Sequence, residues 1–268
     1  MSIRHRDAPE PGADGLSLPP SVTFVCCIES GALEEMTVRL AASLRRFGGR
    51  FAEAPIIAVE PRRGVALRPQ TVDALKQYNV VLERRPTANA HPWFSFFNKL
   101  AALKIGDALA TTDTVCWLDS DILVLDEPNL LALAADEDFA ACASDNCGAT
   151  TGPGDKNDAY WRLVIELAGL AFEAYPWLTN CQGNRVRAYY NSGVFVYRRG
   201  RGFLDRYPAT CERLLESGFK SPVTGVFFTD QVTLAASAIA AGLRIRSLPL
   251  AYNYPVGAST EQPYSPEI

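Results

Sequence analysis

Two carboxylates stand at positions 119 and 121, where an apolar run of the sequence is interrupted. The stretch 114–126 reads TVCWLDSDILVLD, and residues 115–118 have the continuous apolar character of a strand buried in a parallel sheet. Asp119, Ser120 and Asp121 therefore follow the end of that strand. Two negative charges there cost desolvation and mutual repulsion, unless a cation or a water-filled cleft lies beside them. A hard divalent cation takes oxygen ligands, so the pair indicates a metal site, and the alternative is an acidic loop that caps a strand in water.

Three further polar segments could contribute side chains to a site. Lys99 lies near the start of an expected helix, where a lysine is ordinarily solvated. The other two are Asn191-Ser192-Gly193, which interrupts an apolar stretch, and Asp230-Gln231, which opens an apolar helix. In that last helix Thr229 or Asp230 is expected to serve as the N-cap.

The elements that must position these residues alternate between strand and helix. Short apolar runs bounded by turn residues predict strands, and apolar residues at helical spacing predict helices. Up to residue 82 the order is strand, helix, strand, helix, strand, which is typical of an α/β protein with a parallel sheet. The sequence predicts strands at 21–28, 54–59, 80–82, 115–118, 122–125, 139–142 and 243–248, a strand pair or bent strand at 186–197, and helices at 33–47, 69–78, 128–133, 160–175, 202–216, before residue 114 and after 229.

The length of 268 residues suits one domain that buries a sizeable core. Residues 1–20 are polar and rich in proline and glycine, so we expect a disordered tail there and a single domain over 21–268. Residues 146–184 begin with a run of Gly, Thr, Asp and Asn, which indicates an insertion or a lid.

The amino-acid composition argues against nucleic-acid binding, a membrane span and a disulfide-stabilised fold. Hydrophobic residues make up 48% and charged residues 21% of the chain, and a formal charge of -4 gives no electrostatic footprint for nucleic acid. No apolar run reaches the length of a membrane span, and no signal peptide precedes residue 21, so we expect a cytoplasmic protein. The seven cysteines form no C-x-x-C pair, and their odd number argues against a complete disulfide framework.

Four segments in order resemble glycosyltransferase family 8, the family of glycogenin and galactinol synthase. They are Asn98-Lys99-Leu100, LDSDILVL around Asp119, NSGVFVY from Asn191, and Asp230-Gln231. The resemblance implies a GT-A fold, which is Rossmann-like, with a mostly parallel central sheet flanked by helices and a DxD loop. It also implies a hexosyltransferase that uses a nucleotide-sugar donor, with UDP as the expected nucleotide, and a sugar, polyol or glycan as acceptor.

The same resemblance assigns roles to the residues. Asp119 and Asp121 would bind Mn²⁺ or Mg²⁺, which grips the diphosphate of the donor, while Ser120 and Lys99 would lie at the same donor site. Asn191, Ser192 and Gly193 would line the sugar side, with Gly193 allowing a close backbone approach. Asp230 and Gln231 would face the transferred sugar and the acceptor. Both are the expected catalytic residues. Family 8 retains anomeric configuration, which implies either a front-face exchange or a poorly placed nucleophile, with Asp230 and Gln231 the residues at issue; in an inverting relative Asp230 would be the general base.

One feature of the family is missing. Its third metal ligand is a histidine near the C-terminus, whereas this chain has only His5 and His91, neither in the matching place. We expect a further segment beyond Ile268 to supply it, with another oxygen donor, a water molecule or weak metal binding as the alternatives.

Two other functions remain open. A strand that ends in D-x-D also occurs in haloacid-dehalogenase-like phosphatases, with Asp119 as nucleophile, Asp121 as general acid and GDKND at 154–158 as the downstream acidic motif. The missing histidine is also compatible with a GT-A domain that binds a sugar nucleotide or glycan without turnover.

Overall fold

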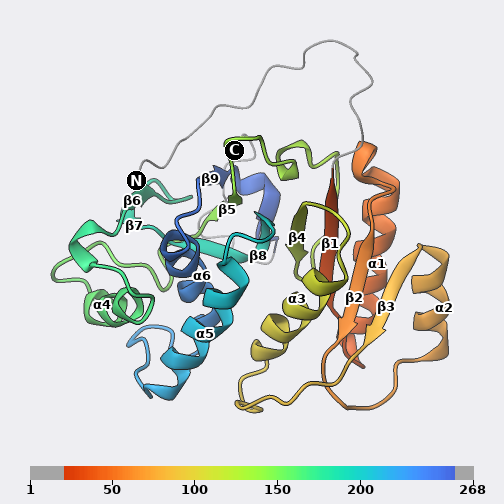
Figure 1. The fold of residues 1–268 in the computed structure, drawn as a ribbon, viewed down its shortest axis with the longest axis horizontal. Helices are drawn as coiled ribbons and strands as arrows, with labels where there is room; N and C mark the ends of the chain where they lie inside the picture. Colours follow the sequence, from red (N-terminus) through yellow and green to blue (C-terminus); the bar gives the residue numbers. More distant parts are fainter. Residues whose placement is uncertain (1–20, 257–268) are drawn as a thin grey trace, which may run out of the picture. The chain divides into compact units, whose positions relative to one another are not determined.

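The computed structural model describes residues 21–256, which form two compact units (Figure 1). The N-terminal unit holds residues 21–134 and 196–199, and the C-terminal unit holds 135–195 and 200–256. The expected disordered tail at 1–20 and the expected missing segment after Ile268 lie outside the described residues. The single domain over 21–268 and the lid at 146–184 stay predictions, and the two units are described separately.

The N-terminal unit contains four parallel strands. They are β1 (Val22–Cys27), β2 (Ile56–Glu60), β3 (Val80–Arg84) and β4 (Thr114–Leu118), in the spatial order β3-β2-β1-β4. Phe24 of β1 lies opposite Ile56 of β2 on one side and Cys116 of β4 on the other. All five residues of β4 are buried, as the continuous apolar run predicts for a central parallel strand.

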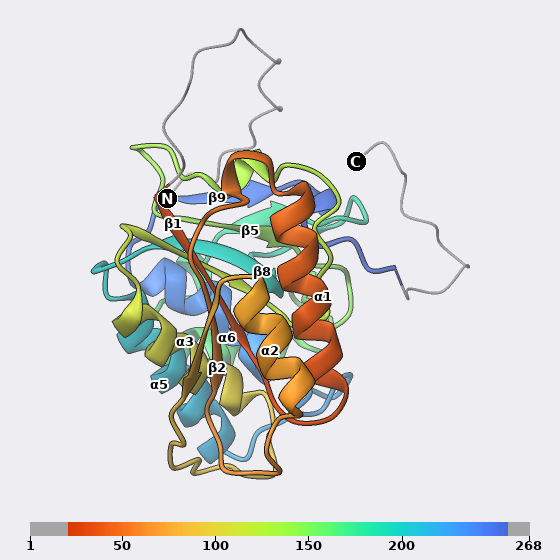
Figure 2. The ribbon, with the colours of Figure 1, turned by 90° about the vertical axis from the view of Figure 1, so that its right-hand side faces the viewer.

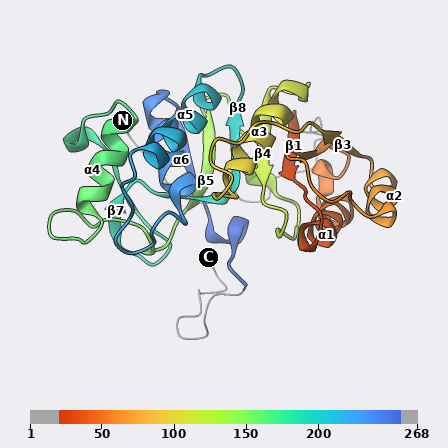
Figure 3. The ribbon, with the colours of Figure 1, turned by 90° about the horizontal axis from the view of Figure 1, so that it is seen from below.

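Helices cover both faces of these four strands. Figure 3 shows α3 (Phe97–Leu109) on one face and α1 (Ala32–Phe47) on the opposite face. Figure 2 shows α2 (Pro69–Gln77) beside α1, and these two helices pack together. The α3 helix approaches β1 closely, because a Cβ atom at Gly106 would lie 2.7 Å from Val25 Cγ2. Two short 3-10 helices, η1 (Gly49–Phe51) and η2 (Asn129–Leu131), complete the unit.

A buried carboxylate ties α1 to α2. Glu34 is 2% exposed and accepts hydrogen bonds from the backbone N–H of Gly31 and Arg68 and from Thr71 Oγ1, at 3.1, 2.8 and 2.6 Å. The hydrogen bond from Thr71 is the main cause of a carboxyl pKa lowered to about 2. The ionised carboxylate of Glu34 therefore links the start of α1 to the start of α2 by hydrogen bonds.

The C-terminal unit is built around a helix with no exposed face. Its strand β5 (Phe139–Ala143) lies between β8 (Tyr190–Arg198) and β9 (Ile245–Leu248), and β5 pairs with β9 in parallel. The last residues of β8, from 196 on, belong to the N-terminal unit. Helices α4 (Asp158–Leu167), α5 (Phe203–Glu216) and α6 (Thr229–Ala240) pack against one another, and every α6 residue from 229 to 239 is buried. The 3-10 helix η4 (Leu250–Asn253) follows β9.

Between α4 and β8 the chain is held by stacked arginines and aromatic rings. The short strands β6 (Trp177–Thr179) and β7 (Arg185–Arg187) pair antiparallel, after the 3-10 helix η3 (Phe172–Ala174). The guanidinium of Arg187 lies 4.3 Å from the Phe172 ring centre and 4.1 Å from that of Trp177. Arg162 lies 3.9 Å from Phe172 and Arg185 lies 4.7 Å from Trp177. We call these five side chains the arginine ladder.

Four local predictions of secondary structure were wrong. The helix expected at 160–175 ends at Leu167 as α4, and residues 172–174 form the separate turn η3. Residues 122–125 form no strand, and Leu123 and Leu125 are 55% and 76% exposed, so this apolar run follows the acidic residues as an open loop. The helix expected at 128–133 is only the 3-10 turn η2. The triplet at 191–193 makes no bend, because β8 runs through it. The larger prediction of an α/β fold with a mostly parallel sheet is confirmed.

Within residues 21–256 no helix combines the length and the apolar character needed to cross a membrane.

Candidate functional site

The acidic residues follow β4 at the carboxyl end of the N-terminal unit's parallel strands, and side chains from β1 and β4 fix their loop. Ser120, 7% exposed, donates from Oγ to the carbonyl oxygen of Cys27, the last residue of the neighbouring strand β1. Trp117 of β4 donates from Nε1 to Asp119 Oδ1 at 2.7 Å. The conformation of the D-x-D segment is therefore set by buried partners. We call Lys99, Trp117, Asp119, Ser120 and Asp121 the acidic site.

The cation that the buried strand end requires is Lys99. Its side chain is 5% exposed, and Nζ lies 3.1 Å from Asp119 Oδ1 and 3.4 Å from Oδ2. The same Nζ lies 5.5 Å from the ring centre of Trp117. Lys99 is thus no solvated helix lysine, because α3 carries it onto the acidic site.

The positive charge of Lys99 offsets the charge of Asp121 much less than that of Asp119. Asp121 is exposed as a whole, but partial desolvation of its carboxyl group, together with the negative charge of Asp119, raises its pKa. Lys99 lowers that pKa only as a smaller effect. The acidic site therefore retains negative charge that a further cation would neutralise.

The thiols beside the acidic site are unreactive. Burial, with a smaller effect of Asp119, raises the pKa of Cys26 to about 12, and burial also raises the pKa of Cys27. Both thiols therefore stay protonated at neutral pH, and among residues 21–256 neither joins Asp119 and Asp121 in a three-ligand cluster.

The remaining predicted residues lie in the C-terminal unit. Ser192 of β8 donates from Oγ to Asp230 Oδ2 at 2.9 Å, and Asp230 is 2% exposed. Neither Thr229 nor Asp230 is the N-cap of α6, so that prediction was wrong: the cap position is Phe228, and Thr229 Oγ1 donates to the carbonyl of Val226. The Asp230 carboxylate is therefore linked to β8 by the hydroxyl of Ser192.

Gln231 joins three elements of the same unit. Its Nε2 donates to Ser144 Oγ, which follows β5, at 3.2 Å and to Tyr189 Oη, which precedes β8. Its Oε1 accepts from the backbone N–H of Ser192 at 3.3 Å. We call Ser144, Tyr189, Ser192, Asp230 and Gln231 the Gln231 cluster. Sequence reasoning missed Ser144 and Tyr189, although a polar residue directly after the apolar run 139–143 was a usable signal.

Asn191 and Gly193 have a local explanation. Asn191 Oδ1 accepts from the N–H of Gly193 at 2.7 Å and from Asn253 Nδ2. A Cβ atom at position 193 would lie 3.1 Å from both Asn191 Oδ1 and Asn253 Nδ2. The space that a side chain would need is therefore taken by two asparagines, of which Asn253 was not foreseen.

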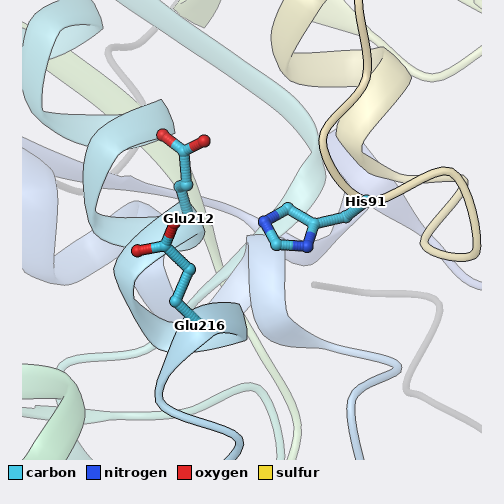
Figure 4. A group of neighbouring side chains, drawn as sticks. All are labelled: His91, Glu212 and Glu216. Carbon is cyan, nitrogen blue, oxygen red and sulfur yellow. The ribbon is translucent and has the colours of Figure 1, made fainter.

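Among residues 21–256, no additional histidine, cysteine or carboxylate completes a three-ligand metal cluster with Asp119 and Asp121 at the acidic site. Figure 4 shows Glu212 and Glu216 one turn apart on α5, and His91 on the loop before α3. Because His91 belongs to the N-terminal unit and the two glutamates to the C-terminal unit, we assign no metal site to them.

Solved structures with the same fold are glycosyltransferases. An active-site mutant of LgtC is 15% identical, with a TM-score of 0.51 over 90% of this chain and 81% of LgtC. Core-mannan synthase A (CmsA/Ktr4) from Aspergillus fumigatus, in its Mn/GDP form, is 11% identical, with a TM-score of 0.50 over 92% and 80%. At such identities the similarity establishes the fold, which is that of the GT-A glycosyltransferases.

Other similar chains are longer. The mannosyltransferase PcManGT from Pyrobaculum calidifontis, crystallised with GDP-Man and Mn²⁺, is 16% identical, with a TM-score of 0.42. The present chain covers 58% of PcManGT, and it covers 47% of GlyE from Streptococcus pneumoniae. No curated protein sequence matches the chain. The model of the Rhodobacterales glycosyltransferase domain matches residues 24–242, so the chain belongs to this glycosyltransferase family.

Proposed function

We propose that the protein is a metal-dependent glycosyltransferase that moves a hexose from a nucleotide sugar, with UDP as the nucleotide, to a sugar, polyol or glycan acceptor. Family membership and the GT-A fold support transfer chemistry. The order of the four segments, which is that of family 8, supports a retaining reaction. The mannosyltransferases among the similar structures bind GDP or GDP-Man, so GDP is the competing nucleotide.

The acidic site carries the proposal. Lys99 compensates Asp119 at 3.1 Å, whereas the pKa of Asp121 is raised by burial and by Asp119. Two carboxylates, of which only one has a buried cation, fit a divalent ion that takes oxygen ligands. Asp119 and Asp121 would hold Mn²⁺ or Mg²⁺, and the ion would stabilise as a Lewis acid the charge that develops on the departing diphosphate.

The chain's own residues have separate tasks in this proposal. Ser120 and Trp117 keep the Asp119 carboxylate in place by hydrogen bonds to β1 and β4. Lys99 supplies a fixed positive charge for the diphosphate. In the C-terminal unit Asn191, Ser192 and Gly193 serve the transferred sugar, with Asp230 as the charged group of that side.

A calorimetric titration tests the proposal. Asp119→Ala and Asp121→Ala should each abolish the Mn²⁺-promoted binding of UDP. The thermal unfolding temperature should change little in Asp121→Ala and should fall in Asp119→Ala, which removes the carboxylate partner of the buried Lys99. Asp126→Asn is the matched control, because Asp126 is an exposed carboxylate of the same loop and accepts a hydrogen bond from the adjacent N–H of Glu127. Unchanged UDP affinity in both alanine variants refutes the metal-dependent donor site.

One observation favours a second function, a GT-A domain that binds donor without turnover. This observation is the lack of a three-ligand cluster around Asp119 and Asp121 among residues 21–256. Mn²⁺-dependent binding of UDP, with no UDP release from UDP-glucose, UDP-galactose or GDP-mannose, would establish it. The phosphatase alternative has no such support, since the family is one of glycosyltransferases and Asp155 of the 154–158 motif accepts hydrogen bonds from Thr151 and Asn157 within its own turn.

A further inference from the structure

The side chain of Gln231 has little freedom to react. It is 4% exposed, and both protons of its amide nitrogen are used, one on Ser144 Oγ at 3.2 Å and one on Tyr189 Oη. Its oxygen accepts from the N–H of Ser192 at 3.3 Å. A carboxamide has two donors and one acceptor oxygen, so three of its positions are occupied by protein.

The orientation of this carboxamide follows from its partners. The backbone N–H of Ser192 can only donate, so the oxygen and not the nitrogen of Gln231 must face it. The two hydroxyl groups on the other side, from Ser144 and Tyr189, can each accept a proton. A rotated carboxamide would set two donors against each other at Ser192, which would leave a buried N–H without an acceptor.

Tyr189 is the most firmly placed partner of Gln231. Tyr189 is completely buried, and its ring packs edge-on against Trp161 with 5.4 Å between ring centres. A Cβ atom at Gly148 would lie 3.0 Å from Tyr189 Oη, and Gly148 has a φ of +85°, which a side chain would rarely adopt. Burial raises the pKa of the Tyr189 hydroxyl, so it stays protonated and neutral.

From these contacts we infer that Tyr189 and Gln231 are positioning residues, and that Gln231 is a strut and not the attacking group of the transfer. The inference rests on the proposed function. The hydroxyl of Tyr189 fixes the carboxamide of Gln231, the carboxamide fixes the backbone of Ser192, and Ser192 Oγ holds the carboxylate of Asp230 at 2.9 Å. The carboxylate of Asp230, which the proposed function places on the sugar side, therefore depends for its position on a chain of hydrogen bonds that begins at Tyr189.

Steady-state kinetics test the strut through UDP release from UDP-glucose and UDP-galactose with Mn²⁺. Tyr189→Phe should lower kcat by about tenfold, the effect of one lost buried hydrogen bond, and Gln231→Ala, which loses three, by between about tenfold and a thousandfold, each with KM for the donor within about twofold of wild type. The double variant should be no slower than Gln231→Ala, because the hydroxyl acts through the carboxamide. A multiplied loss in the double variant, a fully active Tyr189→Phe, or a loss above about a thousandfold in Gln231→Ala overturns the inference.

A second measurement needs no turnover. The Ser192 amide proton is held by Gln231 Oε1, so NMR hydrogen exchange at Ser192 should accelerate at least about tenfold in Tyr189→Phe. Tyr175→Phe is the matched control, because it also removes a buried hydroxyl hydrogen bond, 2.9 Å to the carbonyl of Ala188, and should leave Ser192 exchange unchanged. Equal exchange in the wild type and Tyr189→Phe refutes the strut. Because this readout is independent of UDP release, a wild-type protein that releases no UDP would count against the proposed function alone.

Discussion

Removing the charge of Lys99 should raise the affinity of the protein for Mn²⁺ and lower its affinity for UDP. Lys99 competes with any further cation for Asp119, since Nζ lies 3.1 Å from Oδ1. Two cations about 5 Å apart that share one carboxylate, one of them divalent, repel by about 2 kcal/mol at an effective dielectric constant of about 60. Lys99→Met should therefore bind Mn²⁺ roughly 30-fold more tightly than wild type.

The affinity for UDP should change in the opposite direction. In the presence of saturating Mn²⁺, Lys99→Met loses one charge-assisted contact with the diphosphate, which is worth about 2 kcal/mol, so UDP should bind roughly 30-fold more weakly. Methionine keeps an apolar stem in place of that of the buried lysine, which limits the loss of stability.

Calorimetry with Mn²⁺ alone, and then with UDP at saturating Mn²⁺, measures both changes. Lys104→Met is the matched control, because Lys104 is exposed on the same helix α3. If both affinities of Lys99→Met move in the same direction, or if Lys104→Met reproduces the changes, the placement of Lys99 between cation and diphosphate is refuted.

Three further predictions concern the N-terminal unit. Glu34→Gln should lower the free energy of unfolding by about 2–3 kcal/mol at pH 7 in urea titrations, with the exposed Glu35→Gln as a near-neutral control. Because the pKa of Glu34 is lowered to about 2 in the folded state, this deficit should be complete above the ordinary value of 4.5 and should disappear as pH falls toward 2; a deficit independent of pH contradicts the assignment. The raised pKa of Asp121 predicts that Mn²⁺ affinity declines on acidification from a pH above the ordinary carboxyl value of 3.8, and that Asp121→Asn abolishes this step. Gly106→Ala should lower thermal stability by about 1–3 kcal/mol through the clash with Val25, which a gain in thermal stability would refute.

Local patterns in the sequence single out residues 119–121, and their role as a metal and donor site stays a prediction. A buried strand followed by two carboxylates needs a nearby cation, and Lys99 is found there at 3.1 Å. Which lysine would do this did not follow from periodicity, since residues 99 and 119 meet only through the packing of α3 on β1.

The failures have local physical causes. Leu123 and Leu125 belong to an apolar run that has no sheet neighbour, so composition alone predicted a strand that hydrogen bonding does not support. Asp230 is a residue type that often caps helices, but its carboxylate accepts a hydrogen bond from Ser192, which is 38 residues away in sequence. The sequence predicts only that Tyr189 lies in an apolar strand. Its hydroxyl accepts a hydrogen bond from Gln231, which is 42 residues away, and no local pattern indicates this contact.

The arginine ladder limits how the segment between α4 and β8 can move. Its four cation–π contacts link α4, η3, β6 and β7, and at roughly 0.5–1 kcal/mol each they hold these elements together by about 2–4 kcal/mol. A state that breaks all four contacts would thus be populated at a few per cent at most, whereas the separation of α4 and η3 from β7 breaks only the contact of Arg187 with Phe172. Gly152, just ahead of α4, packs against the same ladder, because a Cβ atom there would lie 3.0 Å from Trp177 Cη2, so any gating by residues 146–184 would have to carry this turn along with β6.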